Sequence, residues 1–141
     1  MRLTWAIVIA GASLVMGTPP ALAHHSFAAQ YDANKPIEMK GVVTKVEWTN
    51  PHARFYIDVK GGGGDVTNWN FELASPNVLI RNGWKPNTLK IGDPITVAGY
   101  LARSGPTSGP KMAIASGVTS SDGRKLFASS AQDLSRSGGV P

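Results

Sequence analysis

Residues Ile37 to Val59 read IEMKGVVTKVEWTNPHARFYIDV, and their hydrophobic pattern indicates the architecture of the whole chain. From Phe55 to Val59, hydrophobic and polar residues alternate, which is the period-2 pattern of a strand buried on one face. Residues 49–52 (TNPH) predict a turn before that strand, because proline cannot donate to a strand ladder and asparagine before proline favours chain reversal. The segment therefore predicts two antiparallel strands joined by a short turn.

The first of these strands changes phase along its length. Ile37 and Met39 share one face, whereas Val42 and Val46 share the other. The change falls at Gly41, where a residue without Cβ can adopt the backbone geometry of a bulge. We expect a long strand that bends at Gly41, which is how a small and strongly coiled barrel begins.

The rest of the chain supplies more strands and one helix. A helix of about two turns should follow Ser75-Pro76, because serine is a good N-cap and proline suits the first helical position. The expected segments are strands 66–73, 93–101 and 111–118, a helix between Pro76 and Asn82, and an edge strand 124–128. In strand 111–118, we expect the side chains of Met112, Ile114 and Val118 to face inward. This order predicts an all-β protein, a small OB-like five-stranded Greek-key barrel with one short helix between strands three and four.

The first 23 residues have the features of a secretory signal peptide. Arg2 provides a positive start, residues 5–16 form an apolar run too short to span a bilayer comfortably, and Ala21-Leu22-Ala23 is an A-x-A cleavage site. The alternative is an uncleaved anchor helix, which the short run and the small-residue site disfavour. We therefore expect an exported protein, periplasmic or extracellular, with no transmembrane segment after cleavage.

Cleavage after Ala23 would leave a chain of 118 residues, enough for one compact domain. We expect an extended segment 24–36 that Phe27 and Tyr31 anchor on the barrel, a barrel domain 37–128, and a disordered tail 129–141. The chain has no cysteine, which excludes disulfides and thiolate chemistry. Its formal net charge of +5 comes from scattered residues and favours an ordinary soluble surface over a polyanion-binding patch.

Four segments carry a resemblance to a known family: the predicted mature start HHSF, the turn WTNPH, the segment ELASPN before the helix, and the turn DGRKLF. Together they cover most of the predicted mature chain, up to about Ser130. The chain resembles the family of small exported bacterial proteins known as domain of unknown function 6152. The resemblance implies export, and it implies no particular activity or ligand because the family has none established. The four-glycine turn 61–64 and the loop 105–110 depart from the family pattern and look like loop variation.

The three histidines suggest a metal site. His24 and His25 would start the mature chain, where the free α-amine and the Nδ1 of His24 can close a chelate ring on one ion. His52, in the turn between the first two strands, could complete the site. Amine and imidazole donors suit Cu(II), Ni(II) or Zn(II), with Cu(II) bound most tightly, so copper or zinc is the expected ion. Binding should weaken at acid pH because the donors must lose their protons.

A second interpretation of the histidines is that His24 and His25 are solvated terminal residues and His52 only shapes a turn. Geometry also weighs against a shared site, because the chain of an OB-type barrel is expected to begin its first strand at the opposite end from the strand one–two turn. The thirteen residues from His24 to Pro36 could still span up to ~43–47 Å when extended. Both interpretations stay open at this point.

The outward residues of strands two and three form a second candidate site. Tyr56, Asn68, Asn70 and Glu72 offer donors and acceptors for a sugar or peptide, although an antiparallel sheet is ordinarily polar on its solvent face. One aromatic and two carboxylates, Asp58 and Glu72, make a poor nucleic-acid platform, so we exclude nucleic acid as a partner. No catalytic motif is visible. We expect a non-enzymatic β-barrel that binds a metal or small ligand; the alternative is a structural or protein-interaction module of the cell envelope.

Overall fold

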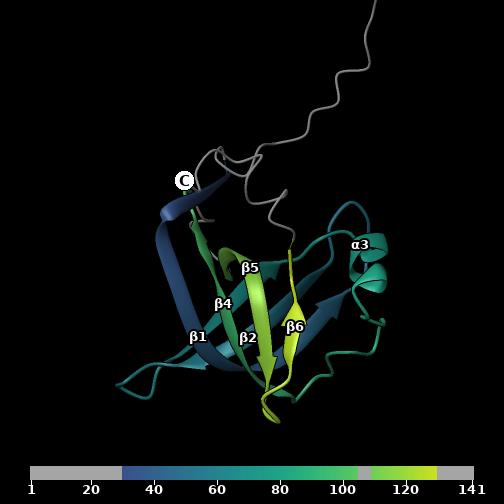
Figure 1. Ribbon diagram of the computed structural model, residues 1–141. Coiled ribbons are helices and arrows are strands. Elements are labelled where there is room, and N and C mark those ends of the chain that lie inside the picture. The colour runs from purple at the N-terminus through teal and green to yellow at the C-terminus, as the bar shows by residue number, and fades with distance from the viewer. Residues whose placement is uncertain (1–29, 105–108, 130–141) are drawn as a thin grey trace, which may run out of the picture.

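The computed structural model describes residues 30–104 and 109–129, which form a β-barrel with one short helix (Figure 1). Its elements in chain order are β1 (Tyr31–Glu47), β2 (Arg54–Lys60), β3 (Val66–Glu72), α3 (Pro76–Arg81), β4 (Pro94–Ala102), β5 (Lys111–Ser120) and β6 (Lys125–Phe127).

The strand order closes the sheet into a barrel. The strands are hydrogen-bonded in the order β3-β2-β1-β4-β5-β6, and β3 also pairs with β5 in parallel, with Glu72 opposite Ile114. The remaining pairs are antiparallel. This arrangement confirms the predicted all-β five-stranded barrel, and α3 lies between β3 and β4 as expected. The helix has Pro76 in its first turn, and Leu79 is buried.

The first strand is longer than its sequence pattern predicts, because it begins at Tyr31 and not at Ile37. Its first part pairs with β4 from Tyr31 to Val42, and its second part pairs with β2 from Val42 to Glu47. A single strand thus belongs to both halves of the barrel. Residues 31–36, expected in a separate N-terminal segment, are part of β1.

The change of phase in β1 lies two residues after the predicted position. Val43 is in the core with 1% of its surface exposed, whereas Val42, which is predicted to share a face with Val46, is 43% exposed. The register shift falls between Val43 and Lys45, so the core-facing pattern continues through Gly41 to Val43 before it changes. The prediction of a bulge at Gly41 is therefore wrong.

Gly41 has a different role from the predicted one. A Cβ at this position would lie 2.7 Å from the carbonyl oxygen of Asp58 and 3.0 Å from Cδ1 of Ile57. Only glycine therefore allows β1 to pass so close to β2 as it turns toward β4.

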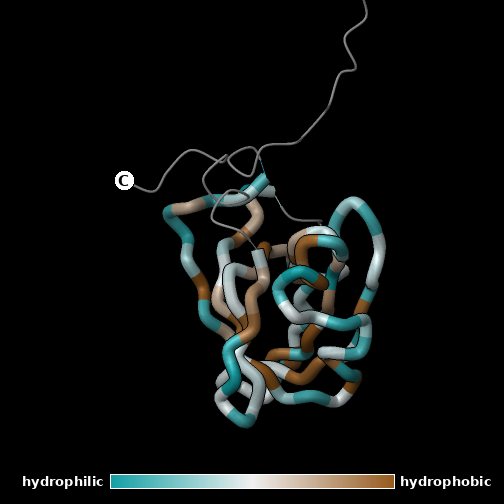
Figure 2. The backbone as a smooth tube through the Cα atoms, turned by 45° about the vertical axis from the view of Figure 1, so that its right-hand side comes forward, coloured by the Kyte–Doolittle hydropathy of each residue, from teal (hydrophilic) through white to brown (hydrophobic). Residues whose placement is uncertain are grey.

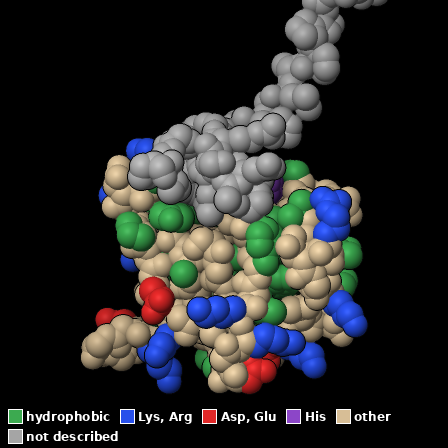
Figure 3. Space-filling view, viewed as in Figure 1, with side chains coloured by type: hydrophobic (Ala, Val, Ile, Leu, Met, Phe, Trp, Pro, Cys, Tyr) green, Lys and Arg blue, Asp and Glu red, His purple; other side chains and the backbone are tan. Residues whose placement is uncertain are grey.

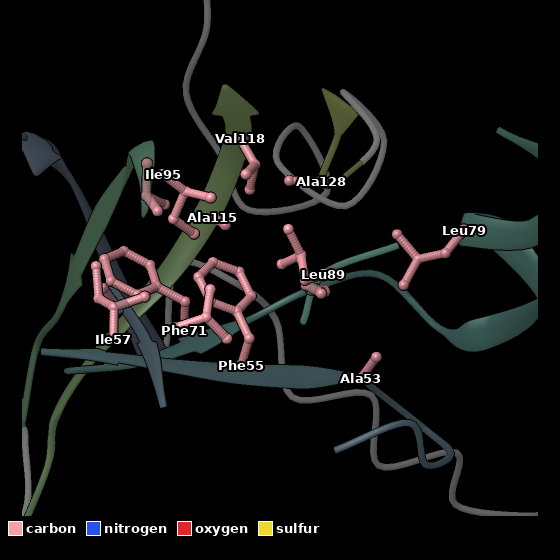
Figure 4. Packing of buried hydrophobic residues seen from close by; sticks show 14 of the residues in the cluster. Ala53, Phe55, Ile57, Phe71, Leu79, Leu89, Ile95, Ala115, Val118 and Ala128 are labelled. Carbon is pink, nitrogen blue, oxygen red and sulfur yellow. The ribbon is translucent and has the colours of Figure 1, made fainter. Parts of the chain in front are cut away.

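The core fills the barrel between its two halves (Figure 4). The rings of Phe55 and Phe71 stack with centroids 5.4 Å apart, in contact with a cluster that includes Ile57, Val97 and Val118. In Figure 2, the hydrophobic positions lie mostly within the outline of the barrel, and the outermost loops are hydrophilic or near neutral. The alternation predicted for β3 is confirmed, since Trp69, Phe71 and Leu73 are all buried.

The inward face of β5 differs from the prediction. Ala113 and Ala115 join the main core with Val118, whereas Ile114 belongs to a second, outer cluster around Tyr31. Met112 lines a cavity on the outer side. A prediction based on side-chain size selects the wrong set, because the inner face of β5 carries small alanines beside Val118.

The end of the barrel extends one residue beyond the predicted boundary. Ser129, expected in a disordered tail, is buried and its hydroxyl donates to the carbonyl oxygen of Ala115 at 2.8 Å. The predicted signal peptide 1–23 and the tail from residue 130 lie outside the described residues. Within residues 30–104 and 109–129, no helix has the length and hydrophobicity needed to span a bilayer.

Candidate functional site

The start of β1 folds over the outer face of the barrel. Tyr31 is only 2% exposed and packs with Ile114 and Tyr100 in the outer cluster. Ile114 is the lateral partner of Glu72, and Tyr31 lines a cavity together with Glu72 and Arg54. The first described part of the strand therefore lies beside the ends of β2 and β3, next to the β1–β2 turn. This position is contrary to the expectation that the chain begins β1 at the opposite end of the barrel.

Glu72 is the centre of this region. Its side chain is 8% exposed, and its Oε2 accepts a hydrogen bond from Nη2 of Arg54 at 2.5 Å. The two residues are direct cross-strand partners in the β2–β3 ladder. A carboxylate buried to this degree requires such a charged partner, because an isolated charge in a low-dielectric environment is costly. The cavity beside the pair has a volume of about 230 Å³, and Gln30, Ser104 and Met112 complete its wall.

The ring of His52 is held by the same end of β3. Its Nδ1 lies 3.2 Å from the carbonyl oxygen of Leu73 and 3.8 Å from Oε1 of Glu72. A carbonyl oxygen can only accept, so Nδ1 carries the hydrogen and donates it. In the neutral ring Nε2 is then unprotonated, and the side chain is 45% exposed to solvent. Among the described residues, Nε2 of His52 has no hydrogen-bond partner, so its lone pair is available to a ligand.

Tyr31 responds to the same carboxylate. Burial, the negative charge of Glu72 and a hydrogen bond to that carboxylate together raise the pKa of the Tyr31 phenol far above its usual range, against a smaller opposing effect of Arg54. The phenol is therefore a hydrogen-bond donor at every physiological pH. We refer to Tyr31, His52, Arg54 and Glu72 as the Glu72 site.

Of the predicted metal ligands, His52 lies in the Glu72 site, and His24 and His25 lie outside the described residues. Among residues 30–104 and 109–129, no three His, Cys, Asp or Glu side chains are close enough to hold a metal ion by themselves. Gln30, the first described residue, lines the cavity beside Glu72. The chain that leads back to His25 therefore starts at this site.

The predicted polar face is present on β2 and β3, but most of its groups bind one another. The Tyr56 hydroxyl donates to Oε2 of Glu47 at 3.1 Å and is approached by Nδ2 of Asn70 at 3.4 Å. Asn68 donates to Oδ1 of Asp58 at 2.7 Å. These bonds leave few groups to recognise a sugar or peptide. Glu72 differs from the others because it is buried in the site described above.

Lys45 forms an ion pair with Glu47 on that face. Its Nζ lies 2.5 Å from Oε1 of Glu47, and this bond holds the pKa of the Glu47 carboxyl below its usual range. Burial and the hydrogen bond to Glu47 raise the pKa of Tyr56. Lys45 is exposed, and Glu47 and Tyr56 are partly buried, as on the ordinary polar surface of an antiparallel sheet.

Two residues of the Glu72 site, Arg54 and Tyr31, belong to no functional motif in the sequence. Arg54 could have been paired with Glu72 from the hairpin register alone, since the two face each other across β2 and β3. Tyr31 is expected from the sequence only as an anchor, and its burial confirms that part. Its contact with a residue 41 positions away in the chain depends on the curvature of β1 and has no local signal.

A comparison with family models places most of the chain in one family. The model described as "Family of unknown function (DUF6152)" matches residues 11–111, which include β1, the β1–β2 turn and the Glu72 site. The comparison with curated proteins finds none that matches. The residues quoted from the sequence for this resemblance lie partly within that match. Since the match covers more than half of the chain, the protein belongs to the DUF6152 family.

Proposed function

We propose that this is an exported, non-enzymatic metal-binding protein that holds one Cu(II) or Zn(II) ion between the start of its mature chain and His52. His24 would chelate the ion through its α-amine and Nδ1, and Nε2 of His52 would be a further ligand. The His25 imidazole is available for a remaining position. Copper is favoured over zinc because nitrogen donors bind Cu(II) more tightly.

The orientation of the His52 ring carries the proposal. Metal-ligating histidines ordinarily donate their other ring N–H to a backbone carbonyl or a carboxylate, which fixes the tautomer and strengthens the ligating nitrogen. The Nδ1 of His52 has both kinds of acceptor nearby, with Leu73 O at 3.2 Å and Glu72 Oε1 at 3.8 Å. With Nδ1 as the donor, Nε2 is the ring nitrogen whose lone pair remains for a metal ion.

The length of chain supports a shared site. Gln30 lies at the cavity beside Glu72, and Tyr31 packs over that carboxylate. The seven residues from His24 to Gln30 can span up to ~23–25 Å when extended, a reach that supports a ligand set shared between the terminal amine and His52. The start of β1 lies next to the β1–β2 turn and not at the opposite end of the barrel, so barrel geometry does not weigh against a shared site.

The test is a calorimetric titration of Cu(II) and Zn(II) into protein that the cell has exported and processed, with its first residue verified by mass. A control protein carries one extra residue before His24, and a second variant is His52→Ala. Loss of a metal ligand should weaken binding at least about tenfold, since even the loss of a hydrogen-bond partner of a ligand costs about 10–100-fold. We expect one ion per chain, and weaker binding in both altered proteins.

The same titration also gives the results that would contradict the proposed metal site. Equal binding in all three proteins would contradict a histidine site. Loss of binding in the extended protein alone would leave a terminal chelate without His52. If no protein binds an ion, the remaining candidate is a structural or interaction module of the cell envelope, and co-purification of a partner would be the next experiment.

A further inference from the structure

A second concave site lies at the end of the barrel away from His52. It is an open cleft of about 790 Å³, close to the upper range of small-ligand pockets. We name it the lysine cleft after its two lysines; its main lining residues are Lys40, Val42, Lys60, Val66, Thr96 and Thr119. None of these residues belongs to the Glu72 site, so a ligand in the lysine cleft would be independent of the proposed metal site.

The path of β1 creates this cleft. Val42 is the residue at which β1 stops pairing with β4 and starts pairing with β2. Beyond this point β2 and β3 continue as a two-stranded arm, since Lys60 and Val66 pair only with each other. The arm extends away from the barrel body beyond β1 in Figure 1, and it protrudes at the lower left of Figure 3. The cleft lies between this arm and the ends of β4 and β5.

The floor of the lysine cleft is apolar. Val42 and Val66 are 43% and 55% exposed, and they are two of the four large hydrophobic residues that the described chain leaves most exposed. Pro94 and the nearly buried Ile95 lie beside them. Exposed apolar side chains that lie together in one concavity mark a ligand-binding site more often than isolated exposed apolar side chains do.

The lining of the cleft also carries charged side chains, the two lysines Lys40 and Lys60 and the carboxylate of Asp58. Lys40 and Lys60 form no ion pair with any described residue. The one carboxylate in the lining, Asp58, accepts a hydrogen bond from the neutral amide of Asn68 and keeps its negative charge, so the two lysines and Asp58 leave the lining with a net charge of +1. Thr96 and Thr119 add hydroxyl donors.

We propose that the lysine cleft binds a small organic anion with an apolar chain, of the medium-chain carboxylate class. The two ammonium groups would hold the carboxylate, and the chain would cover Val42 and Val66. Burial of a methylene contributes roughly 0.8 kcal/mol, so an aliphatic tail on this floor strengthens binding. The same chemistry is available from a free acid and from an anionic lipid, and the cleft is proposed to take the free acid.

The test is a calorimetric and ¹⁵N NMR titration of the processed protein with decanoate below its micelle concentration. Decyltrimethylammonium has a similar chain with the opposite charge, and acetate has the charge without the chain. We expect saturable decanoate binding with shifts at Val42, Lys60 and Val66, and little binding of the other two probes. Equal binding of decyltrimethylammonium, or shifts confined to other surfaces, would overturn the proposal.

Charge-reversal variants, with a control outside the cleft, test whether decanoate binds in the lysine cleft. Lys40→Glu and Lys60→Glu should each weaken decanoate binding by about threefold to fivefold or more, because each removes a favourable surface ion pair. Lys85→Glu makes the same change of net charge outside the cleft and should leave binding unaltered. Val66→Ser should weaken binding of the chain while both lysines remain. An equal loss in Lys85→Glu would show a nonspecific charge effect and overturn the site.

Vesicles of phosphatidylglycerol distinguish the source of the anion. Under the proposal, the protein binds free decanoate and does not sediment with the vesicles. Sedimentation with the vesicles, combined with no binding of free decanoate, would overturn the proposal in favour of a membrane surface.

Discussion

The carboxylate of Glu72 accounts for the arrangement of the site at the scale of single residues. It binds Arg54, lies near Nδ1 of His52, and adds to the effect of burial in raising the pKa of Tyr31. All of these side chains come from the outer face of the barrel, where polar residues ordinarily meet solvent. The extension of β1 covers this face and so turns an expected surface carboxylate into a buried one.

The Tyr31 phenol should make stability sensitive to alkaline pH. Its pKa is raised in the folded protein, so its contribution to stability is complete below the ordinary tyrosine pKa of about 10 and is lost as pH rises above it. Tyr31→Phe should lower the free energy of unfolding by about 1 kcal/mol at neutral pH, through the lost hydrogen bond. It should also flatten the loss of stability at alkaline pH.

Chemical denaturation between neutral pH and about pH 11 measures both effects. Tyr100→Phe, which removes a hydroxyl from β4 in the same outer cluster, is the matched control for the loss of a phenol. If Tyr31→Phe and the wild-type protein lose stability in parallel above pH ~10, the phenol is not coupled to folding.

The Arg54–Glu72 pair should be costly to break from one side. Arg54→Ala leaves a buried carboxylate without its partner, which should lower the free energy of unfolding by about 3–5 kcal/mol. The double variant Arg54→Leu with Glu72→Leu should be less destabilised than Arg54→Ala, because it removes both charges. Lys45→Ala breaks an exposed pair and should change stability little. Equilibrium urea unfolding compares the three, and similar losses for Arg54→Ala and Lys45→Ala would contradict the buried pair.

At the scale of secondary structure, the close crossing of strands depends on particular glycines. A Cβ on Gly99 in β4 would lie 2.0 Å from the carbonyl oxygen of Ile114, whereas a Cβ on Gly117 in β5 would meet nothing within 4 Å. Gly99→Ala should therefore destabilise the protein by about 1–3 kcal/mol through overpacking, and Gly117→Ala should be near neutral. The two urea midpoints are the measurement. Equal midpoints would show that β4 and β5 can separate without cost.

The sequence predicts an element well where contacts between nearby residues fix its position, and poorly where contacts between distant residues do. Trp69, Phe71 and Leu73 are predicted correctly because a regular two-residue period is a local signal. The prediction for Val42 is wrong because the bulge position depends on how β1 pairs with β2, and Gly41 offers a more obvious place for it. The predictions for Met112 and Ile114 are wrong because Tyr31 covers the outer face of β5, which gives that face a small core of its own.

At the scale of the whole molecule, β1 connects the two candidate sites. Its beginning lies over the Glu72 site, and its bend at Val42 forms the floor of the lysine cleft. The sequence indicates the barrel and singles out His52, but the proximity of Gln30 and Tyr31 to the β1–β2 turn depends on the curvature of a 17-residue strand. No local pattern reports that curvature, so sequence reasoning overestimates the distance that separates the start of β1 from His52.

The most direct test of a shared metal site is the ¹⁵N NMR spectrum of the His52 ring during a titration with Zn(II), which is diamagnetic and stands in for copper. The protein must begin at His24. We expect Nδ1 to be protonated before zinc is added, and one equivalent of zinc to move the Nε2 signal while Nδ1 stays protonated. Binding of zinc with both His52 nitrogen signals unchanged, or a free ring protonated at Nε2, would contradict it.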